Sequence, residues 1–167
     1  MMPDSSPAAQ SATERPHVLV VTDDADLGSF LGEGLLFAGF WTSVVASGIQ
    51  TLEVFRLRTF DLVLIDAALG GLSAREVIRR LREQAARVRS GGAGKDASRT
   101  DVPILLVVAD ASEVNPAEAR AAGADDVLVA PLDLEELAPR LHAIVRDWRA
   151  AHPDRPMADA AAREADD

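Results

Sequence analysis

Two groups of aspartates follow aliphatic runs, and they are the residues best suited to chemistry. Asp66 ends the run 62–65, and an acidic stretch at 23–26 (Asp-Asp-Ala-Asp) follows the run 17–22. A charged carboxylate is costly inside an apolar layer, so each group should emerge where its strand ends. In open α/β sheets, ligands bind at the carboxyl ends of the strands. These aspartates are therefore the candidate site residues.

Five short runs predict strands, and the continuously aliphatic runs among them predict strands buried on both faces, as in parallel sheets. The five runs are 17–22, 41–45, 62–65, 103–108 and 126–129. Each is followed by a stretch in which apolar residues recur at helical spacing. This alternation of strand and helix predicts an α/β fold: a parallel sheet between layers of helices, joined by right-handed crossovers.

Local signals mark the ends of the predicted helices. Gly39 stands where the first helix should end, and Ser73 with Glu76 has the S-x-x-E form of a capping box. Asn115-Pro116 predicts a cap followed by proline at the first helical position, and Asp133 predicts the cap of the last helix. Three glycines should weaken the first helix, each by up to ~1 kcal/mol relative to alanine: Gly28, Gly32 and Gly34.

Composition divides the chain into one folded domain and three polar segments. We expect a disordered leader at 1–15, a domain at 16–150 with a flexible Gly/Ser-rich insertion at 90–101, and a disordered acidic tail at 151–167. The formal net charge of −10 argues against binding the phosphate backbone of nucleic acids. Cysteine is absent, which fits a cytoplasmic protein, and no apolar run is long enough to insert into a membrane.

Several of these segments together resemble the receiver domain of two-component response regulators. They are VLVVTDDADL, DLVLIDAALGGLSAREV, PILLVVAD and AGADDVLVAPLDLEEL. The resemblance extends from about His17 to Arg149. It implies a doubly wound, flavodoxin-like (CheY-like) (βα)5 sandwich with strand order 2-1-3-4-5, whose switch point lies between the first and third strands.

The resemblance also implies a role for each matching position. Asp66 corresponds to the aspartate that accepts a phosphoryl group from a histidine kinase. Asp23, Asp66 and the carbonyl of Ala68 correspond to the ligands of Mg²⁺, with Asp24 nearby as a further carboxylate. Thr22 falls on the family's first acidic position.

Three other positions depart from the family pattern. Val108 replaces a hydroxyl residue and Ala130 replaces a lysine, which in the family bind the phosphoryl oxygens. Val127 replaces the aromatic residue that usually reports the switch. The implied site is therefore degenerate, and a phosphorylated Asp66 would lack the contacts that shift a receiver between its two states.

These observations predict a stand-alone atypical receiver that is not an enzyme and acts in signal transduction by protein–protein interaction, independently of phosphorylation. It requires no cofactor and binds Mg²⁺ at most weakly. One alternative is a phosphorylatable single-domain regulator, and another is a small hydrolase of the haloacid-dehalogenase type, suggested by Asp24-Ala25-Asp26. The expected partners are signalling proteins: a histidine kinase, another regulator or a second copy of the chain. Arg120 and Arg140 mark the expected partner face.

Overall fold

Five parallel strands form one sheet in the computed structural model, which describes residues 15–89 and 101–153. The strands are β1 (His17–Val21), β2 (Trp41–Val45), β3 (Leu62–Asp66), β4 (Ile104–Val108) and β5 (Asp126–Val129). Their order in the sheet is β2-β1-β3-β4-β5, and all neighbouring pairs are parallel. The predicted doubly wound fold and its strand order are confirmed.

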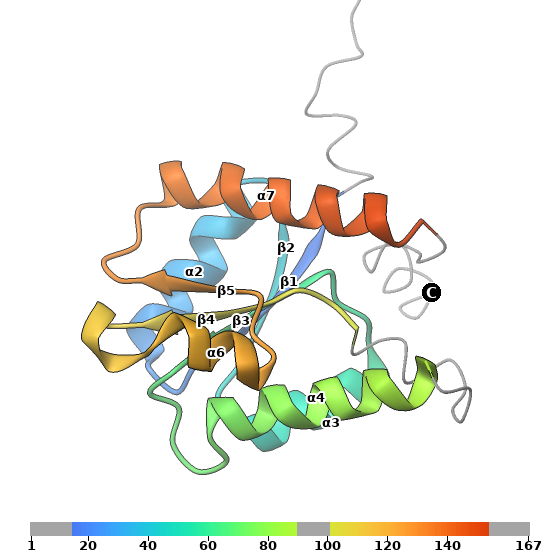
Figure 1. The fold of residues 1–167 in the computed structure, drawn as a ribbon. Helices are drawn as coiled ribbons and strands as arrows, with labels where there is room; N and C mark the ends of the chain where they lie inside the picture. Colours follow the sequence, from blue (N-terminus) through green and yellow to red (C-terminus); the bar gives the residue numbers. More distant parts are fainter. Residues whose placement is uncertain (1–14, 90–100, 154–167) are drawn as a thin grey trace, which may run out of the picture.

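Helices cover both faces of the sheet (Figure 1). They are α2 (Ala25–Phe37), α3 (Gly48–Leu57), α4 (Ala74–Arg89), a 3-10 turn η1 (Ala111–Glu113), α6 (Pro116–Ala122) and α7 (Leu134–Ala151). One apolar cluster packs α3, α4 and α6 against the sheet, and a second packs α2 and α7 against the opposite face. The central strands β1, β3 and β4 contribute to both clusters, which is why their sequences are continuously aliphatic.

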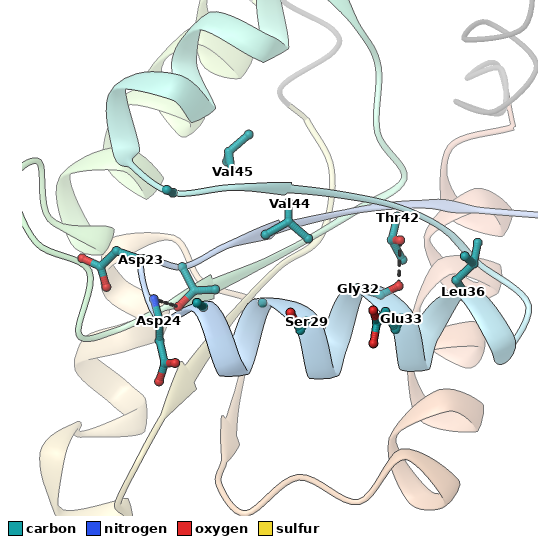
Figure 2. A pocket seen from close by; sticks show the side chains of 13 residues that line it. Asp23, Asp24, Ser29, Gly32, Glu33, Leu36, Thr42, Val44 and Val45 are labelled. Carbon is teal, nitrogen blue, oxygen red and sulfur yellow. Dashed lines mark hydrogen bonds between the residues drawn. The ribbon is translucent and has the colours of Figure 1, made fainter.

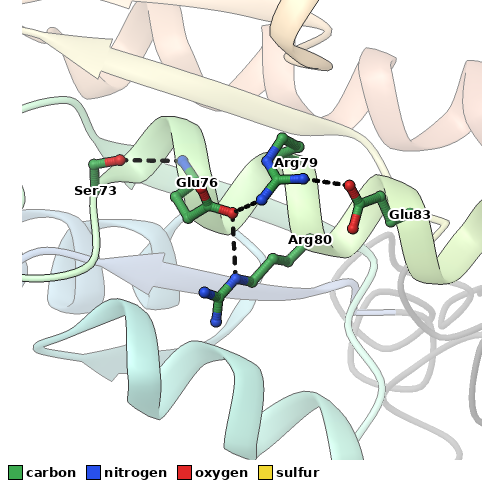
Figure 3. Close-up of polar contacts among 5 residues, drawn as sticks. All are labelled: Ser73, Glu76, Arg79, Arg80 and Glu83. Atoms are coloured by element: carbon green, nitrogen blue, oxygen red, sulfur yellow. Dashed lines mark hydrogen bonds and ion pairs between the residues drawn. The ribbon is translucent and has the colours of Figure 1, made fainter.

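Side chains at the predicted caps bind the first backbone N–H groups of their helices. Asn115 accepts from the N–H of Ala117 at 2.8 Å, with Pro116 at the first helical position, and Asp133 accepts from the N–H of Glu135 at 2.9 Å. Ser73 accepts from the N–H of Glu76 at 3.1 Å, as the capping box predicts (Figure 3). These contacts satisfy N–H groups that have no partner within the helix.

The glycines of α2 stand at positions where a Cβ atom would crowd neighbouring side chains. A Cβ at Gly34 would lie 2.2 Å from Cδ1 of Leu134, which begins α7. Gly39 follows α2 with φ of +98°, a conformation that favours glycine, so the predicted helix end is confirmed. The glycines therefore cost helix propensity but allow α2 to pack closely.

Most residues of the predicted leader, insertion and tail lie outside the described ranges. The described residues at their borders belong to the fold. Arg15 lies over the Trp41 ring at 5.0 Å, Asp101 is buried, and α7 continues to Ala151, with His152 stacked on Trp148.

Candidate functional site

Asp66 ends β3, the central strand, at the carboxyl edge of the sheet. Strand β3 lies between β1 and β4, with Ile65 opposite Val21 and Asp66 opposite Val107. The four residues before Asp66 are fully buried, whereas Asp66 itself is partly exposed. The aliphatic run thus carries this carboxylate to the edge where the sequence places it.

The hydroxyl of Thr22 holds one oxygen of the Asp66 carboxylate. Thr22 is buried at the end of β1, and its Oγ1 donates to Asp66 Oδ2 at 2.7 Å. The same Oγ1 accepts from the N–H of Asp24 at 3.0 Å, and Asp66 Oδ1 accepts from the N–H of Ala68 at 2.9 Å. Both carboxylate oxygens of Asp66 therefore have donors from the chain itself.

The neighbouring aspartates are engaged by backbone groups as well. Asp23 Oδ2 accepts from the N–H of Gly70 at 3.0 Å, which joins the loop after β1 to the loop after β3. Asp24 caps α2, and its Oδ1 accepts from the N–H groups of Asp26 and Leu27 at 2.9 and 3.2 Å. Its carboxylate stabilises the helix end, where a negative charge is favourable.

The three other positions at which the sequence departs from the receiver pattern carry aliphatic side chains. Val108 ends β4 and is buried, and its carbonyl accepts from the N–H of Ala130 at 2.8 Å, so the two positions are adjacent. Val127 is partly buried in β5 and packs against the apolar cluster of α3, α4 and α6. None of these three side chains has a group that could bind a phosphoryl oxygen.

The residues at this edge make a sparse donor set for Mg²⁺. Asp23 and Asp66 supply carboxylates and Ala68 supplies a carbonyl, which are hard oxygens of the kind that Mg²⁺ accepts. Thr22 supplies a hydroxyl whose proton is directed at Asp66. Within residues 15–89 and 101–153, no three His, Asp or Glu side chains are grouped so as to hold a metal. Two carboxylates and one carbonyl are thus the groups that would hold the ion.

Arg120 and Arg140, the residues of the expected partner face, lie on α6 and α7, the helices before and after β5. Arg120 is exposed on α6. Arg140, on α7, is about half exposed and forms an ion pair with Asp126 at the start of β5. The helix before β5 and the helix after it thus each carry one of these arginines.

Comparison with known proteins decides the family. Residues 18–142 match the model of the response regulator receiver domain. The chain belongs to this receiver family. It is 32% identical over 148 residues to the sensory transduction protein RegX3 of Mycolicibacterium smegmatis, covering 89% of this chain and 58% of that protein. It is 34% identical over 134 residues to the DNA-binding response regulator MtrA of Mycobacterium bovis, covering 80% and 52%.

The receiver thus spans a little over half the length of these two curated relatives. Among solved structures, the receiver domain of the Francisella response regulator 1452 superposes with a TM-score of 0.66 at 24% identity, covering 80% of this chain and 98% of that one. This likeness shows the fold. No helix within the described parts of the chain is long and apolar enough to cross a membrane.

Membership in the receiver family removes the basis for the hydrolase alternative. In that reading Asp24 and Asp26 formed a D-x-D pair, but Asp24 caps α2 and Asp26 lies in its first turn. From the sequence, Thr22 was predicted only to lack the acid of the family pattern. Its hydrogen bond to Asp66 was not predicted. The hydrogen bond from the N–H of Gly70 to Asp23 was not predicted either.

Proposed function

We propose that this receiver transmits signals through protein–protein contacts that do not depend on phosphorylation of Asp66. One observation carries the proposal: the Thr22 hydroxyl donates to Asp66 from the position at which the family has an acid. A donor in place of an acid satisfies the acceptor carboxylate internally and removes one of the negative ligands that would recruit Mg²⁺. The carboxylate serves the fold as a hydrogen-bond acceptor.

The aliphatic positions support the same proposal. Phosphoryl transfer is mostly positioning and charge neutralisation, and one lost electrostatic donor typically lowers a rate by ~10²–10³. Val108 and Ala130 stand at two donor positions, so we expect Asp66 to accept phosphate slowly or not at all. The receiver then acts as a binding module rather than an enzyme.

Magnesium has a limited place in this proposal. Asp23, Asp66 and the Ala68 carbonyl would hold the ion, and when bound it would neutralise charge on phosphoryl oxygens. Because the hydroxyl of Thr22 and the N–H groups of Ala68 and Gly70 already bind the two carboxylates, the ion is not needed to stabilise them. We therefore propose that function requires no cofactor.

The proposed contact surface is the face formed by α6, β5 and α7. A modification shifts a conformational equilibrium only through contacts that differ between the two states. Val127 is a small aliphatic residue packed against the core, and Ala130 has no charge to move. We infer that this face keeps one arrangement and that a partner reads it through exposed groups such as Arg120 and Arg140.

Variants of the immobilised chain in a pull-down test the proposal. Asp66→Ala should retain the same signalling proteins as wild type, whereas Arg120→Glu and Arg140→Glu should lose them. Arg146→Glu is the matched control, because Arg146 is an exposed arginine on another side of α7. If Asp66→Ala abolishes capture while the reversals at Arg120 and Arg140 do not, the second candidate, a phosphorylation-controlled receiver, replaces this one.

That second candidate has one observation in its favour. Asp66 remains an aspartate at the carboxyl edge of β3, partly exposed, with Asp23 on the adjoining loop. The Asp66→Asn variant distinguishes the two candidate functions, since an amide keeps the shape of the side chain but cannot accept phosphate. Unchanged capture by Asp66→Asn supports the phosphorylation-independent function.

A further inference from the structure

A groove runs between α2 and the edge strand β2, away from the face formed by α6, β5 and α7. It has a volume of about 510 Å³ and follows α2 from Ala25 to Leu36 (Figure 2). At 1.5 Å per helical residue this is roughly 17 Å, the length of about five residues in an extended chain. The dimensions suit an extended peptide segment.

Two glycines of α2 form the wall that faces β2. A Cβ added at Gly28 or Gly32 would lie 3.2 or 3.0 Å from the methyl groups of Val44, and the Thr42 hydroxyl donates to the carbonyl of Gly32 at 2.8 Å. The helix and the strand thus approach closely at this wall. Val44 nevertheless remains 47% exposed, and Leu36 at the far end is 38% exposed. The groove therefore presents aliphatic surface to a ligand.

Strand β2 also presents backbone groups to the groove side. It is the terminal strand of the sheet and pairs with β1. The N–H of Trp41 donates to Pro16, and the carbonyl of Val45 accepts from Thr22, so these residues direct their backbone groups inward. In a parallel pair alternate residues face the neighbour, so the backbone groups of Thr42 and Val44 face outward. An outward row of such groups is a template for an added strand.

The negative charge of the groove favours a bound peptide segment that carries positive charge. Asp23, Asp24 and Glu33 line it, and none of its lining residues is a lysine, an arginine or a histidine. The sequence at 1–14 carries Asp4 and Glu14 and no basic residue, so it has the same sign as the groove. The sequence at 90–100 carries Lys95 and Arg99 but no large apolar residue. Charge and hydrophobicity together therefore favour a segment of another protein.

We propose that this groove docks an extended, apolar segment of a partner protein that carries arginine or lysine. The segment adds to β2 as a sixth strand through the outward groups of Thr42 and Val44. Its apolar side chains cover Val44 and Leu36, and its basic side chains meet Glu33, Asp23 and Asp24. This surface is additional to the face formed by α6, β5 and α7.

Binding of three end-blocked peptides to the full chain tests the proposal by fluorescence anisotropy. The probe is Arg-Val-Arg-Val-Arg-Val, and the controls are Glu-Val-Glu-Val-Glu-Val and Arg-Gly-Arg-Gly-Arg-Gly. Only the probe combines strand propensity, apolar side chains and positive charge. It should bind at least about tenfold more tightly than either control, and added salt should weaken it. Equal binding of the Arg-Gly peptide would show general charge attraction and overturn the proposal.

Two variants locate the binding. Val44→Pro removes an outward N–H while leaving the pairing with β1 intact, because proline is tolerated on edge strands at such positions. Glu33→Arg reverses the charge of the groove without altering a strand. Each variant should weaken binding of the probe peptide by at least about tenfold. Ile49→Lys, at an exposed position on α3, should leave it unchanged.

The outcomes keep this proposal distinct from the proposed function. If Glu33→Arg binds the probe as wild type does, the groove is not the site, whatever the folding of Val44→Pro. If sedimentation shows that the wild-type chain is a dimer and that Glu33→Arg converts it to a monomer, a second copy is the occupant and the proposal fails. Retained binding by Asp66→Ala and by Arg140→Glu would show a surface separate from the face formed by α6, β5 and α7.

Discussion

Thr22 and Asp66, 44 residues apart in the chain, are joined by a hydrogen bond of 2.7 Å at the carboxyl edge of the sheet. The hydroxyl proton has one fixed direction, because Thr22 Oγ1 accepts from the backbone of Asp24 and is left to donate to Asp66. The residue that the sequence resemblance aligns with an acidic position of receivers is thus a hydrogen-bond donor.

Replacing Thr22 with aspartate should create a stronger magnesium site. A third carboxylate beside Asp23 and Asp66 raises the negative charge available to a hard cation, so we expect Mg²⁺ affinity to rise by at least about tenfold. Calorimetric titration of wild type and Thr22→Asp measures the change. Thr22→Asp combined with Asp66→Asn is the control and should lose the gain. A tight wild-type site would contradict this account of Thr22.

Labelling of Asp66 by a small phosphodonor should be slow or absent in wild type. In the triple variant Thr22→Asp, Val108→Thr, Ala130→Lys it should be faster by ~10² or more, because each donor typically contributes ~10²–10³. Gel-shift detection of the phosphorylated protein measures the rate, and Asp66→Asn in the same background sets the blank. Rapid stoichiometric labelling of wild type would show that its site is competent.

Arg82 should be important for stability, because its guanidinium ties three segments together. It donates to the carbonyls of Gly123 and Val102 at 2.9 and 2.8 Å and to the carboxylate of Asp125 at 2.6 Å. Hydrogen bonds involving a charged group contribute about 1.5–3 kcal/mol each, and they share one side chain here. We expect Arg82→Ala to lower the free energy of unfolding by about 2–4 kcal/mol in urea denaturation.

The matched control for this loss is on the same helix. Arg79 pairs with Glu76 and Glu83 on the exposed side of α4, and Arg80 also contacts Glu76 (Figure 3). Exposed ion pairs contribute little, so Arg79→Ala should leave the unfolding midpoint nearly unchanged. Equal effects of the two variants would mean that the contacts of Arg82 carry no special stability.

His17 should make stability depend on pH. Burial lowers the pKa of His17 below its ordinary value of 6.5, with Asp61 opposing the shift and Arg58 adding to it. Its Nε2 lies 2.8 Å from the Ser43 hydroxyl, and its buried Nδ1 has no hydrogen-bond partner among the described residues. The folded protein therefore favours the neutral ring.

The sign of this effect follows from proton uptake on unfolding. Below pH 6.5 the unfolded chain protonates His17 before the folded chain does, so stability falls as pH falls from 6.5 toward the folded pKa, by at most about 1.4 kcal/mol per unit. Above pH 6.5 the contribution is fully present. Urea denaturation of wild type and His17→Gln from pH 5 to 8 should show a shallower slope for the variant; equal slopes would contradict the prediction.

Much of the fold could be predicted because its signals are local. The aliphatic runs mark strands, Asn115-Pro116 and Asp133 mark helix starts, and Gly39 marks a helix end at its positive φ. Asp66 could be placed at the sheet edge because a charged group ends a run of buried residues. At these positions the type of one or two residues was enough to predict where a strand or helix begins or ends.

The contacts that give the site its character depend on residues far apart in sequence. A threonine in the family's acidic position indicates a loss, and only the register of β1 against β3 shows that its hydroxyl reaches Asp66. Gly34 likewise appears only as a weak helix residue until Leu134 is seen to fill the space beside it. The carboxylate of Glu76 was expected to complete a capping box, and it pairs with Arg79 and Arg80.

The open edge of β2 also bears on solubility. A terminal strand with outward backbone groups and exposed valine is a nucleus for edge-to-edge aggregation, and nearby charges are a common protection against it. Asp23, Asp24 and Glu33 place negative charge beside this edge. Near the isoelectric point of about 4.7 the net charge of the chain vanishes as carboxylates begin to protonate, so intermolecular strand pairing should begin at this edge. Acidic buffers are therefore the conditions in which to look for fibres.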